Sequence, residues 1–192
     1  IIERLLYTDP ASGQRVTKES EVPFYRAQDR VLLAQNRLID PNAIEDYLAI
    51  GGYSALAKAL GDMQPQAVID EVIAAKLRGR GGGGFPTGWK WDATRKAEGD
   101  PKYVICNADE GDPGAYMDRT ILESNPHQLL EGLTICAYGV GADTAIIYVR
   151  AEYPLAIDRL QNAINDARDY GLLGKDVLGK GFEFDIERYP GA

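Results

Sequence analysis

The chain has 192 residues, of which 45% are hydrophobic and 26% are charged, a composition typical of globular proteins with a sizeable core. Its formal net charge of −8, from 29 acidic and 21 basic residues, repels nucleic acids and anionic lipids. No apolar run approaches the roughly 20 residues of a membrane-spanning helix, and no basic-then-apolar signal segment opens the sequence. We therefore expect no nucleic-acid binding, no direct membrane insertion and a cytoplasmic location.

Residues 1–64 are predicted to form an extended and helical N-terminal region. Polar turns around the Pro-Phe-Tyr triplet at 23–25 show no long periodicity, so an extended lead-in is expected to about residue 35. Asp40 as N-cap and Pro41 at the first helical position predict a helix that ends at Gly51. A second helix is predicted over 54–60 and stops at Gly61.

Residues 65–192 are predicted to form a second domain in which strands alternate with helices. The apolar runs at 103–106 and 144–149 are typical of buried strands, and 182–186 alternates apolar with acidic residues as a strand nearer an edge does. This alternation predicts an α/β fold, a Rossmann-like three-layer domain with a mainly parallel sheet. Its helices are expected at about 65–77, 87–97, 127–140 and 154–170.

The cysteines and the single histidine favour structural roles. Cys106 and Cys136 lie thirty residues apart, which fits neither a disulfide framework nor a four-ligand metal site, so both are interpreted as small buried hydrophobes. His127 follows a proline at a predicted helix start and is interpreted as a capping or packing residue. Hydrolysis and acyl transfer therefore lack candidate residues, whereas hydride transfer between bound cofactors needs none.

A glycine-rich stretch, RGRGGGGFPTGWKW at 78–91, is the strongest motif. Gly79, Gly81 and Gly84 satisfy the dinucleotide-binding spacing, but the stretch follows a predicted helix instead of a strand. The nucleoside-triphosphate loop fits worse, because Trp89 precedes Lys90 and no Ser or Thr follows it. An ATPase interpretation is therefore disfavoured.

A phosphate site of another kind suits this stretch. Glycines expose backbone N–H groups, Pro86 can open a helix whose N-terminus attracts an anion, and Lys90 adds a positive charge. The alternative is a flexible hinge followed by aromatic core residues. Three aromatic side chains could stack on a ring: Phe85, Trp89 and Trp91.

The acidic segment at 107–114, NADEGDPG, follows the first predicted strand. Its carboxylates would repel a phosphate but can accept hydrogen bonds from hydroxyls, ring N–H groups or a carboxamide. A metal site is ranked below a cofactor site because the spacing lacks the twelve-residue calcium loop, and a solvated turn is the remaining alternative. The candidate side chains are Asn107, Asp109, Glu110 and Asp112.

Three ordered motifs, the glycine-rich stretch, NADEGDPGAYMDR at 107–119 and NPHQLLEG at 125–132, closely resemble the flavoprotein subunit of respiratory complex I. The resemblance extends to its soluble relatives, the diaphorase subunit of NAD-reducing hydrogenases, the beta subunit of electron-bifurcating hydrogenases and the corresponding formate dehydrogenase subunit. It covers about residues 20–192. The sequences Pro-Phe-Tyr at 23–25 and Ile-Asp-Pro at 39–41 resemble the soluble hydrogenase and formate dehydrogenase branch more than the complex I subunit.

The resemblance implies a non-covalent FMN and NAD(H), with hydride passing between nicotinamide and flavin. Gly79, Arg80, Gly81, Gly82 and Lys90 are implied to cradle FMN, and Asn107, Asp109 and Glu110 to contact the flavin and its ribityl chain. Phe85 is implied to stack on the NADH adenine, and Asp112 takes a position often held by glutamate near the nicotinamide nucleotide. Glu110 and Asp112 are the implied catalytic residues.

The resemblance also implies partners. Family members continue with another flavin loop and with a helical domain whose cysteines bind a 4Fe-4S cluster, so this chain is expected to be the N-terminal part of such a protein, with no metal ligands of its own. Electrons are expected to leave through iron-sulfur subunits of the same complex, including a thioredoxin-like 2Fe-2S subunit. The alternative is a catalytically silent relative that acts as a structural docking subunit.

Overall fold

The computed structural model describes residues 6–191, and the chain divides into two compact units, one ending at Ala34 and the other beginning at Gln35. The first unit contains short elements only. Strands β1 (Tyr7–Thr8) and β2 (Arg15–Val16) pair antiparallel. They are followed by the 3-10 turn η1 (Glu19–Glu21) and the single-turn helix α2 (Pro23–Arg26). The part of the predicted lead-in at residues 1–5 lies outside the described residues.

The second unit is an α/β structure in which a group of helices precedes a three-stranded sheet. The strands are β3 (Tyr103–Ala108), β4 (Thr144–Arg150) and β5 (Asp185–Gly191), with the 3-10 turn η2 (Val177–Gly179) before β5. The helices are α3 (Ile44–Ala49), α4 (Ser54–Asp62), α5 (Pro65–Ala74), α6 (Thr87–Lys96), α7 (Met117–Ser124), α8 (Pro126–Val140) and α9 (Pro154–Asp169). The predicted α/β class with a parallel sheet and a preceding helical region is confirmed.

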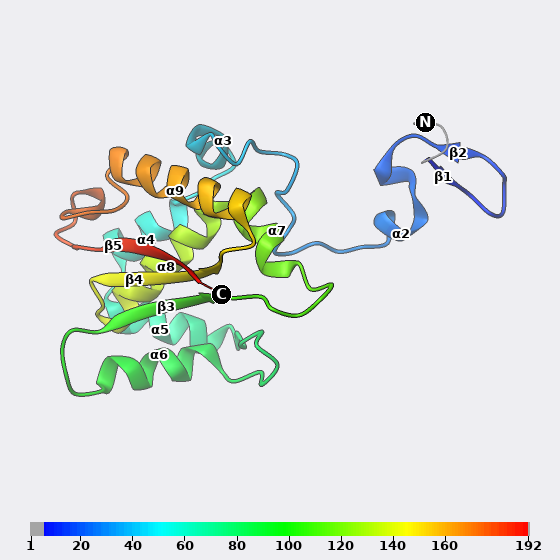
Figure 1. Ribbon diagram of the computed structural model, residues 1–192. Coiled ribbons are helices and arrows are strands. Elements are labelled where there is room, and N and C mark those ends of the chain that lie inside the picture. Colours follow the sequence, from blue (N-terminus) through cyan, green and yellow to red (C-terminus); the bar gives the residue numbers. More distant parts are fainter. Residues whose placement is uncertain (1–5, 192) are drawn as a thin grey trace. The chain divides into compact units, whose positions relative to one another are not determined.

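The sheet has the order β3-β4-β5 and is parallel throughout. Figure 1 shows the three strands side by side, with α9 beyond β5 and with α5 and α6 beyond β3. Right-handed crossovers between strands that advance in one direction place their connecting helices on the same face of the sheet. α8 therefore covers β3 and β4 on the face where α9 covers β5, and these two helices also pack on each other.

The two faces of the sheet differ in burial. Ala145, Ile147 and Val149 of β4 are fully buried on the helix-covered face, whereas Tyr103 and Ile105 of β3 are 51% and 68% exposed on the other. The prediction that 103–106 is a buried strand is therefore wrong for one of its faces, because the helices among residues 6–191 cover only the other face of the sheet. Residues 6–191 supply the sheet and the helices of one face, and a third layer stays an expectation.

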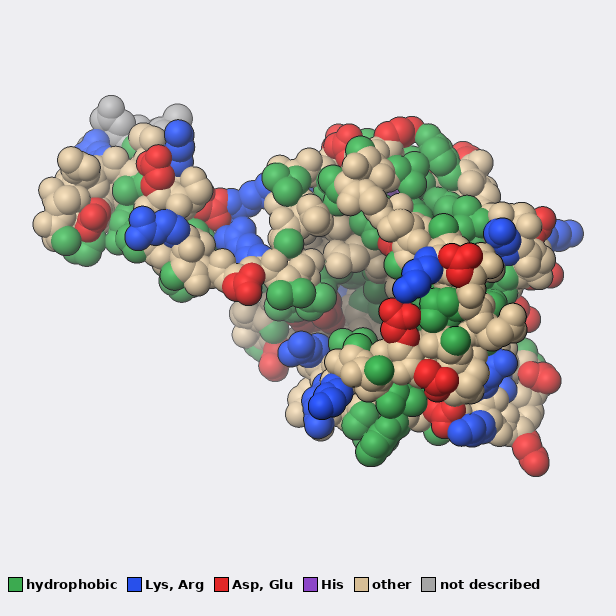
Figure 2. All heavy atoms as spheres, turned by 180° about the vertical axis from the view of Figure 1, so that it is seen from behind, with side chains coloured by type: hydrophobic (Ala, Val, Ile, Leu, Met, Phe, Trp, Pro, Cys, Tyr) green, Lys and Arg blue, Asp and Glu red, His purple; other side chains and the backbone are tan. Residues whose placement is uncertain are grey.

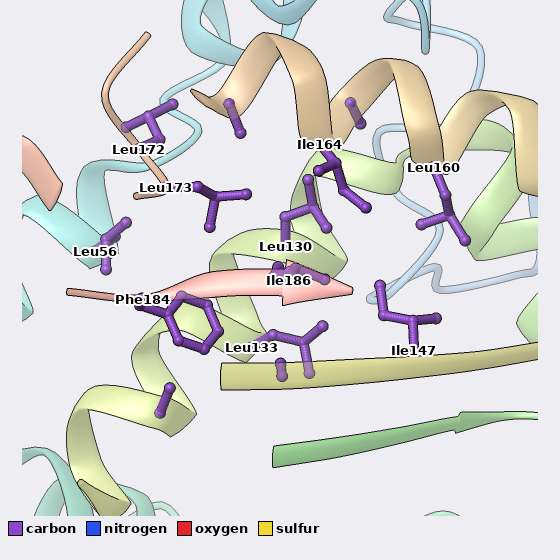
Figure 3. Packing of buried hydrophobic residues seen from close by; sticks show 14 of the residues in the cluster. Leu56, Leu130, Leu133, Ile147, Leu160, Ile164, Leu172, Leu173, Phe184 and Ile186 are labelled. Atoms are coloured by element: carbon purple, nitrogen blue, oxygen red, sulfur yellow. The ribbon is translucent and has the colours of Figure 1, made fainter. Parts of the chain in front are cut away.

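The hydrophobic core fills the space between the helix-covered face and α8 and α9. Figure 3 shows side chains from both helices and from the strands pointing into this space. The glycine after α8, Gly141, ends that helix in the left-handed conformation, and the chain then enters β4. The labelled core side chains include Leu130 and Leu133 of α8, Leu160 and Ile164 of α9, Ile147 of β4 and Ile186 of β5.

Two elements, α3 and β5, start three residues later than the sequence predicts. The Asp40 carboxylate accepts a hydrogen bond from the backbone N–H of Asn42, an Asx turn that delays the helix start to Ile44. The third strand begins at Asp185 and not at Phe182, because Phe184 pairs instead with Gly174 in an isolated antiparallel bridge and buries its ring. Both shifts come from hydrogen bonds that compete with the regular element.

The helices α3 and α4 belong to the second unit, because α3 packs against α9 and α4 packs against α8. A buried carboxylate strengthens this attachment: Glu131 of α8 accepts hydrogen bonds from the Tyr47 hydroxyl (2.6 Å) and from the backbone N–H groups of Tyr53 and Leu56 (3.0 Å each). The boundary between the two compact units thus falls between residues 34 and 35 of the chain. A functional division at residues 64 and 65 stays a prediction.

Charged side chains are mixed on the face drawn in Figure 2, where Lys and Arg alternate with Asp and Glu. On this face the second unit presents no continuous basic stripe of the kind that follows a phosphate backbone.

Candidate cofactor site

The glycine-rich loop at 79–86 connects α5 to α6 and is closed by its own hydrogen bonds. Arg78 and Pro86 form an antiparallel bridge, and the Gly79 N–H donates to the Phe85 carbonyl at 2.9 Å. The Arg78 guanidinium also donates to the Gly84 carbonyl at 2.9 Å. The loop is therefore a defined turn that leads into the N-terminus of α6, and not an open hinge.

Only two glycines of this loop have a backbone conformation that requires glycine. Gly82 and Gly84 have φ values of 93° and 59°, a region that other residues rarely adopt. Gly79, Gly81 and Gly83 have no positive φ. A Cβ at Gly81 or Gly83 would meet no other atom within 4 Å, so the chain itself gives no reason for glycine there. The loop thus leaves its backbone open to close approach from outside.

A cleft of about 490 Å³ lies between the loop, α6, α8 and the edge strand β3. Lys90 lies on its wall and makes no ion pair with any carboxylate among residues 6–191. Phe85 is 59% exposed there, while Trp91 lines the cleft and also lies beside Gly139 of α8. Trp89 does not line the cleft, so two of the three predicted aromatics are available to a ligand. Other lining residues are Gly79, Thr87, Thr94, Tyr103, Val104, Ile105, Cys136 and Val140.

The acidic loop, defined here as residues 109–114, leaves the carboxyl end of β3. The Asn107 side-chain oxygen accepts a hydrogen bond from the Asp109 N–H at 3.0 Å and starts the turn. Glu110 then turns its carboxylate toward α7, where it accepts from the N–H groups of Met117 (2.7 Å), Asp118 (3.2 Å) and Arg119 (3.2 Å). This carboxylate caps the helix N-terminus. α7 was absent from the sequence prediction.

Side chains at and just after the end of β4 also hold the acidic loop. Arg150 donates from Nη1 to the Glu110 carbonyl at 2.7 Å, and the Tyr153 hydroxyl donates to the same oxygen at 3.3 Å. The Glu152 carboxylate accepts a hydrogen bond from Arg150 Nη2 at 2.8 Å. Sequence reasoning missed these three residues. The rule that ligands of parallel sheets bind beyond the carboxyl ends of the strands would have indicated them.

The charges in this area perturb one another. The hydrogen bond from Arg150 lowers the pKa of Glu152, and burial with the neighbouring Glu110 charge raises the pKa of Tyr153. Burial also raises the pKa of Asp118, with a further contribution from Glu110. In the cleft, burial raises the pKa of the Cys136 thiol to about 12, so the thiol is neutral at pH 7. Cys106 behaves alike, with its pKa raised to about 11.

The structure brings the predicted site residues into two groups at one end of the second unit. Figure 1 shows the loop between α5 and α6 and the loop after β3 at the end toward which the strands run. Gly79, Phe85 and Lys90 line the cleft, and the loop also carries the exposed Arg80, Gly81 and Gly82. The second group consists of Asn107, Asp109, Glu110 and Asp112, all exposed except the partly buried Glu110.

The described part of the chain offers neither a metal centre nor a membrane span. Within 6–191, no three His, Cys, Asp or Glu side chains gather closely enough to hold a metal ion. No helix in that range combines the length and apolar character that crossing a membrane requires.

In comparison with known protein families, residues 72–192 match the family described as the Nuo51 FMN-binding domain. The NADP-reducing hydrogenase subunit HndC of Solidesulfovibrio fructosivorans is 52% identical over 167 residues, which are 87% of this chain and 34% of that protein. An NADH-quinone oxidoreductase subunit of Rhizobium meliloti is 50% identical over 162 residues, 84% of this chain and 38% of that protein. This chain thus spans little more than a third of the length of these relatives.

A solved structure supports the same fold. The crystal structure of an NAD+-reducing [NiFe]-hydrogenase in the H2-reduced state aligns with a TM-score of 0.64 and 31% sequence identity. The alignment covers 86% of this chain and 26% of the hydrogenase chain.

Proposed function

Because this chain belongs to the family of the Nuo51 FMN-binding domain, we propose that it is the N-terminal part of an NAD(H):FMN oxidoreductase subunit, a diaphorase. Its relatives carry names of NADH-quinone oxidoreductase and hydrogenase subunits. In this proposal the subunit passes hydride between NAD(H) and FMN and feeds single electrons to iron-sulfur clusters. Bound FMN supplies the chemistry that connects two-electron with one-electron transfer.

The observation that carries the proposal is the open backbone of the glycine-rich loop beside an unpaired lysine. Gly81 and Gly83 have neither a positive φ nor a neighbour that would exclude a Cβ, so a bound group explains glycine there best. Backbone N–H groups and the N-terminus of α6 suit a phosphate, and Lys90 adds the balancing charge. These residues fit the phosphate end of FMN.

The other residues receive roles according to their positions. Phe85, exposed at the cleft, offers a flat surface for the adenine of NAD(H). Asn107 and Asp109 accept hydrogen bonds from the ribityl hydroxyls or the ring edge. Glu110 and Asp112 remain the proposed catalytic residues, and the Glu110 carboxylate also caps the N-terminus of α7. Arg80 and Gly82 complete the phosphate cradle.

Partners and location belong to the proposal as well. A 4Fe-4S cluster in the remainder of the protein and a thioredoxin-like 2Fe-2S subunit would provide the one-electron exits. The protein would work in the cytoplasm, as part of a hydrogenase, NADH dehydrogenase or formate dehydrogenase complex.

The test uses the natural full-length protein in its complex. We expect a yellow flavin absorbance that NADH bleaches. Lys90→Ala should weaken FMN binding at least about tenfold, because a charge-assisted contact to phosphate is lost. The matched control is Lys96→Ala, since Lys96 lies on the same helix and pairs with Asp92. A colourless complex that assembles normally would contradict the proposal and favour a silent docking role.

A further inference from the structure

Arg150, the last residue of β4, connects three separate groups at the carboxyl end of the sheet. Its Nη1 donates to the Glu110 backbone carbonyl at 2.7 Å, while Nη2 and Nε donate to the Glu152 carboxylate at 2.8 and 3.4 Å. Its guanidinium carbon also lies 5.6 Å from the centre of the Tyr153 ring. The planar guanidinium can serve a carbonyl and a carboxylate at once, which an ammonium on a flexible stem does poorly.

Arg150 contacts Glu110, whose backbone carbonyl and side-chain carboxylate both accept hydrogen bonds from outside the acidic loop. The Glu110 carbonyl has two donors, Arg150 and the Tyr153 hydroxyl, and its carboxylate accepts from the N-terminus of α7. Asp109 precedes this anchor and Asp112 follows it by two residues. The carboxylates of these two residues have no hydrogen-bond or ion-pair partner in the part of the chain that the structure describes.

From this arrangement we infer that Arg150 is the positioning residue of the acidic loop and sets where the free Asp112 carboxylate meets the nicotinamide nucleotide. The inference rests on the proposed function. Arg150 reaches the ligand only through the loop, so it is not a catalytic residue. Its loss should therefore affect the binding of NADH more than the retention of FMN, whose phosphate lies with the glycine-rich loop and Lys90.

The test compares Arg150→Gln with Arg168→Gln in the full-length protein within its complex. Arg168 of α9 is a matched control, because it also bridges a carboxylate and a backbone carbonyl: it donates to Asp185 Oδ1 at 3.0 Å and to the Ile186 carbonyl at 3.2 Å. It lies beside the start of β5, at the opposite end of the sheet from Arg150. Each variant is titrated with FMN and assayed for NADH oxidation with an artificial one-electron acceptor.

Arg150→Gln should raise the KM for NADH about tenfold, change kcat less than threefold and leave FMN affinity within threefold of the wild type. Arg168→Gln should leave all three values near the wild type. A purely structural role for Arg150 would give the two variants the same KM, and that result overturns the inference. If Arg150→Gln does not fold, Arg150→Lys decides: it should still raise KM at least threefold, and a wild-type KM overturns the inference.

The wild-type complex shows whether the proposed function or the role of Arg150 has failed. A wild-type complex that neither binds FMN nor oxidises NADH overturns that function, and the role of Arg150 with it. An active wild type whose Arg150→Gln variant matches Arg168→Gln overturns the role of Arg150 alone.

Discussion

His127 lies in the core with one of its ring nitrogens unpaired. Its Nδ1 is 3.0 Å from the Tyr53 hydroxyl, while Nε2 is buried without a partner. Burial lowers the pKa of His127 to about 4. The prediction that this histidine is a packing residue and not a base is confirmed, because a buried neutral ring between two tyrosines has no access to a ligand.

The low pKa of His127 predicts a pH dependence of stability. The unfolded chain binds a proton near pH 6.5 and the folded protein only near pH 4, so stability is complete above pH 6.5 and falls as the pH drops to 4. The loss from this group should be roughly 3 kcal/mol. Urea unfolding at several pH values should therefore show a steeper loss for the wild type than for His127→Gln. Parallel pH profiles would contradict this origin of the dependence.

The glycine-rich loop and the acidic loop show how far residue patterns predict a site. The sequence indicates which residue types could bind a phosphate or a sugar, and Lys90 and Phe85 do line a common cleft. It gives no sign that Trp89 lies outside this cleft or that Arg150 anchors the acidic loop. The first fact depends on which face of α6 lines the cleft, and the second depends on β4 lying next to β3. Tertiary packing sets both.

Among the elements, α7 depends on a cap that comes from outside its own sequence. No side chain at Tyr116 caps the helix, and Glu110, six residues further upstream, accepts from its first N–H groups. Capping signals are recognised next to the helix start, so a cap across a loop escapes sequence analysis. The longer helices α5, α6, α8 and α9 lie close to their predicted ranges, because their apolar spacing and prolines are local signals.

Glu110→Ala should therefore loosen α7. Removing the acceptor leaves the N–H groups of Met117, Asp118 and Arg119 without this partner and should cost about 1 to 2 kcal/mol of local stability. Hydrogen exchange of these amides should accelerate about tenfold. Glu123→Ala is the control, since the Glu123 side chain lies on the same helix and pairs with the Arg119 guanidinium instead of accepting from the first N–H groups. Equal exchange in the two variants would show that Glu110 does not hold the helix.

At the scale of the whole molecule, topology explains why the sheet is covered on one side. The strands advance in one direction, so both crossovers leave Tyr103, Ile105 and Tyr189 on the exposed face. The α/β class could be predicted from the alternation of elements, whereas the exposure of β3 could not, because an apolar run does not show whether one or both faces of its strand are covered.

The most direct test of the FMN-binding proposal is the FMN affinity of Gly81→Ala in the full-length protein. The methyl group would meet nothing within 4 Å and the residue has no positive φ, so the fold should keep its stability or gain up to about 1 kcal/mol. Because the backbone of Gly81 is proposed to approach the phosphate, FMN affinity should fall at least about tenfold. An unchanged affinity at unchanged stability would contradict a phosphate cradle in this loop.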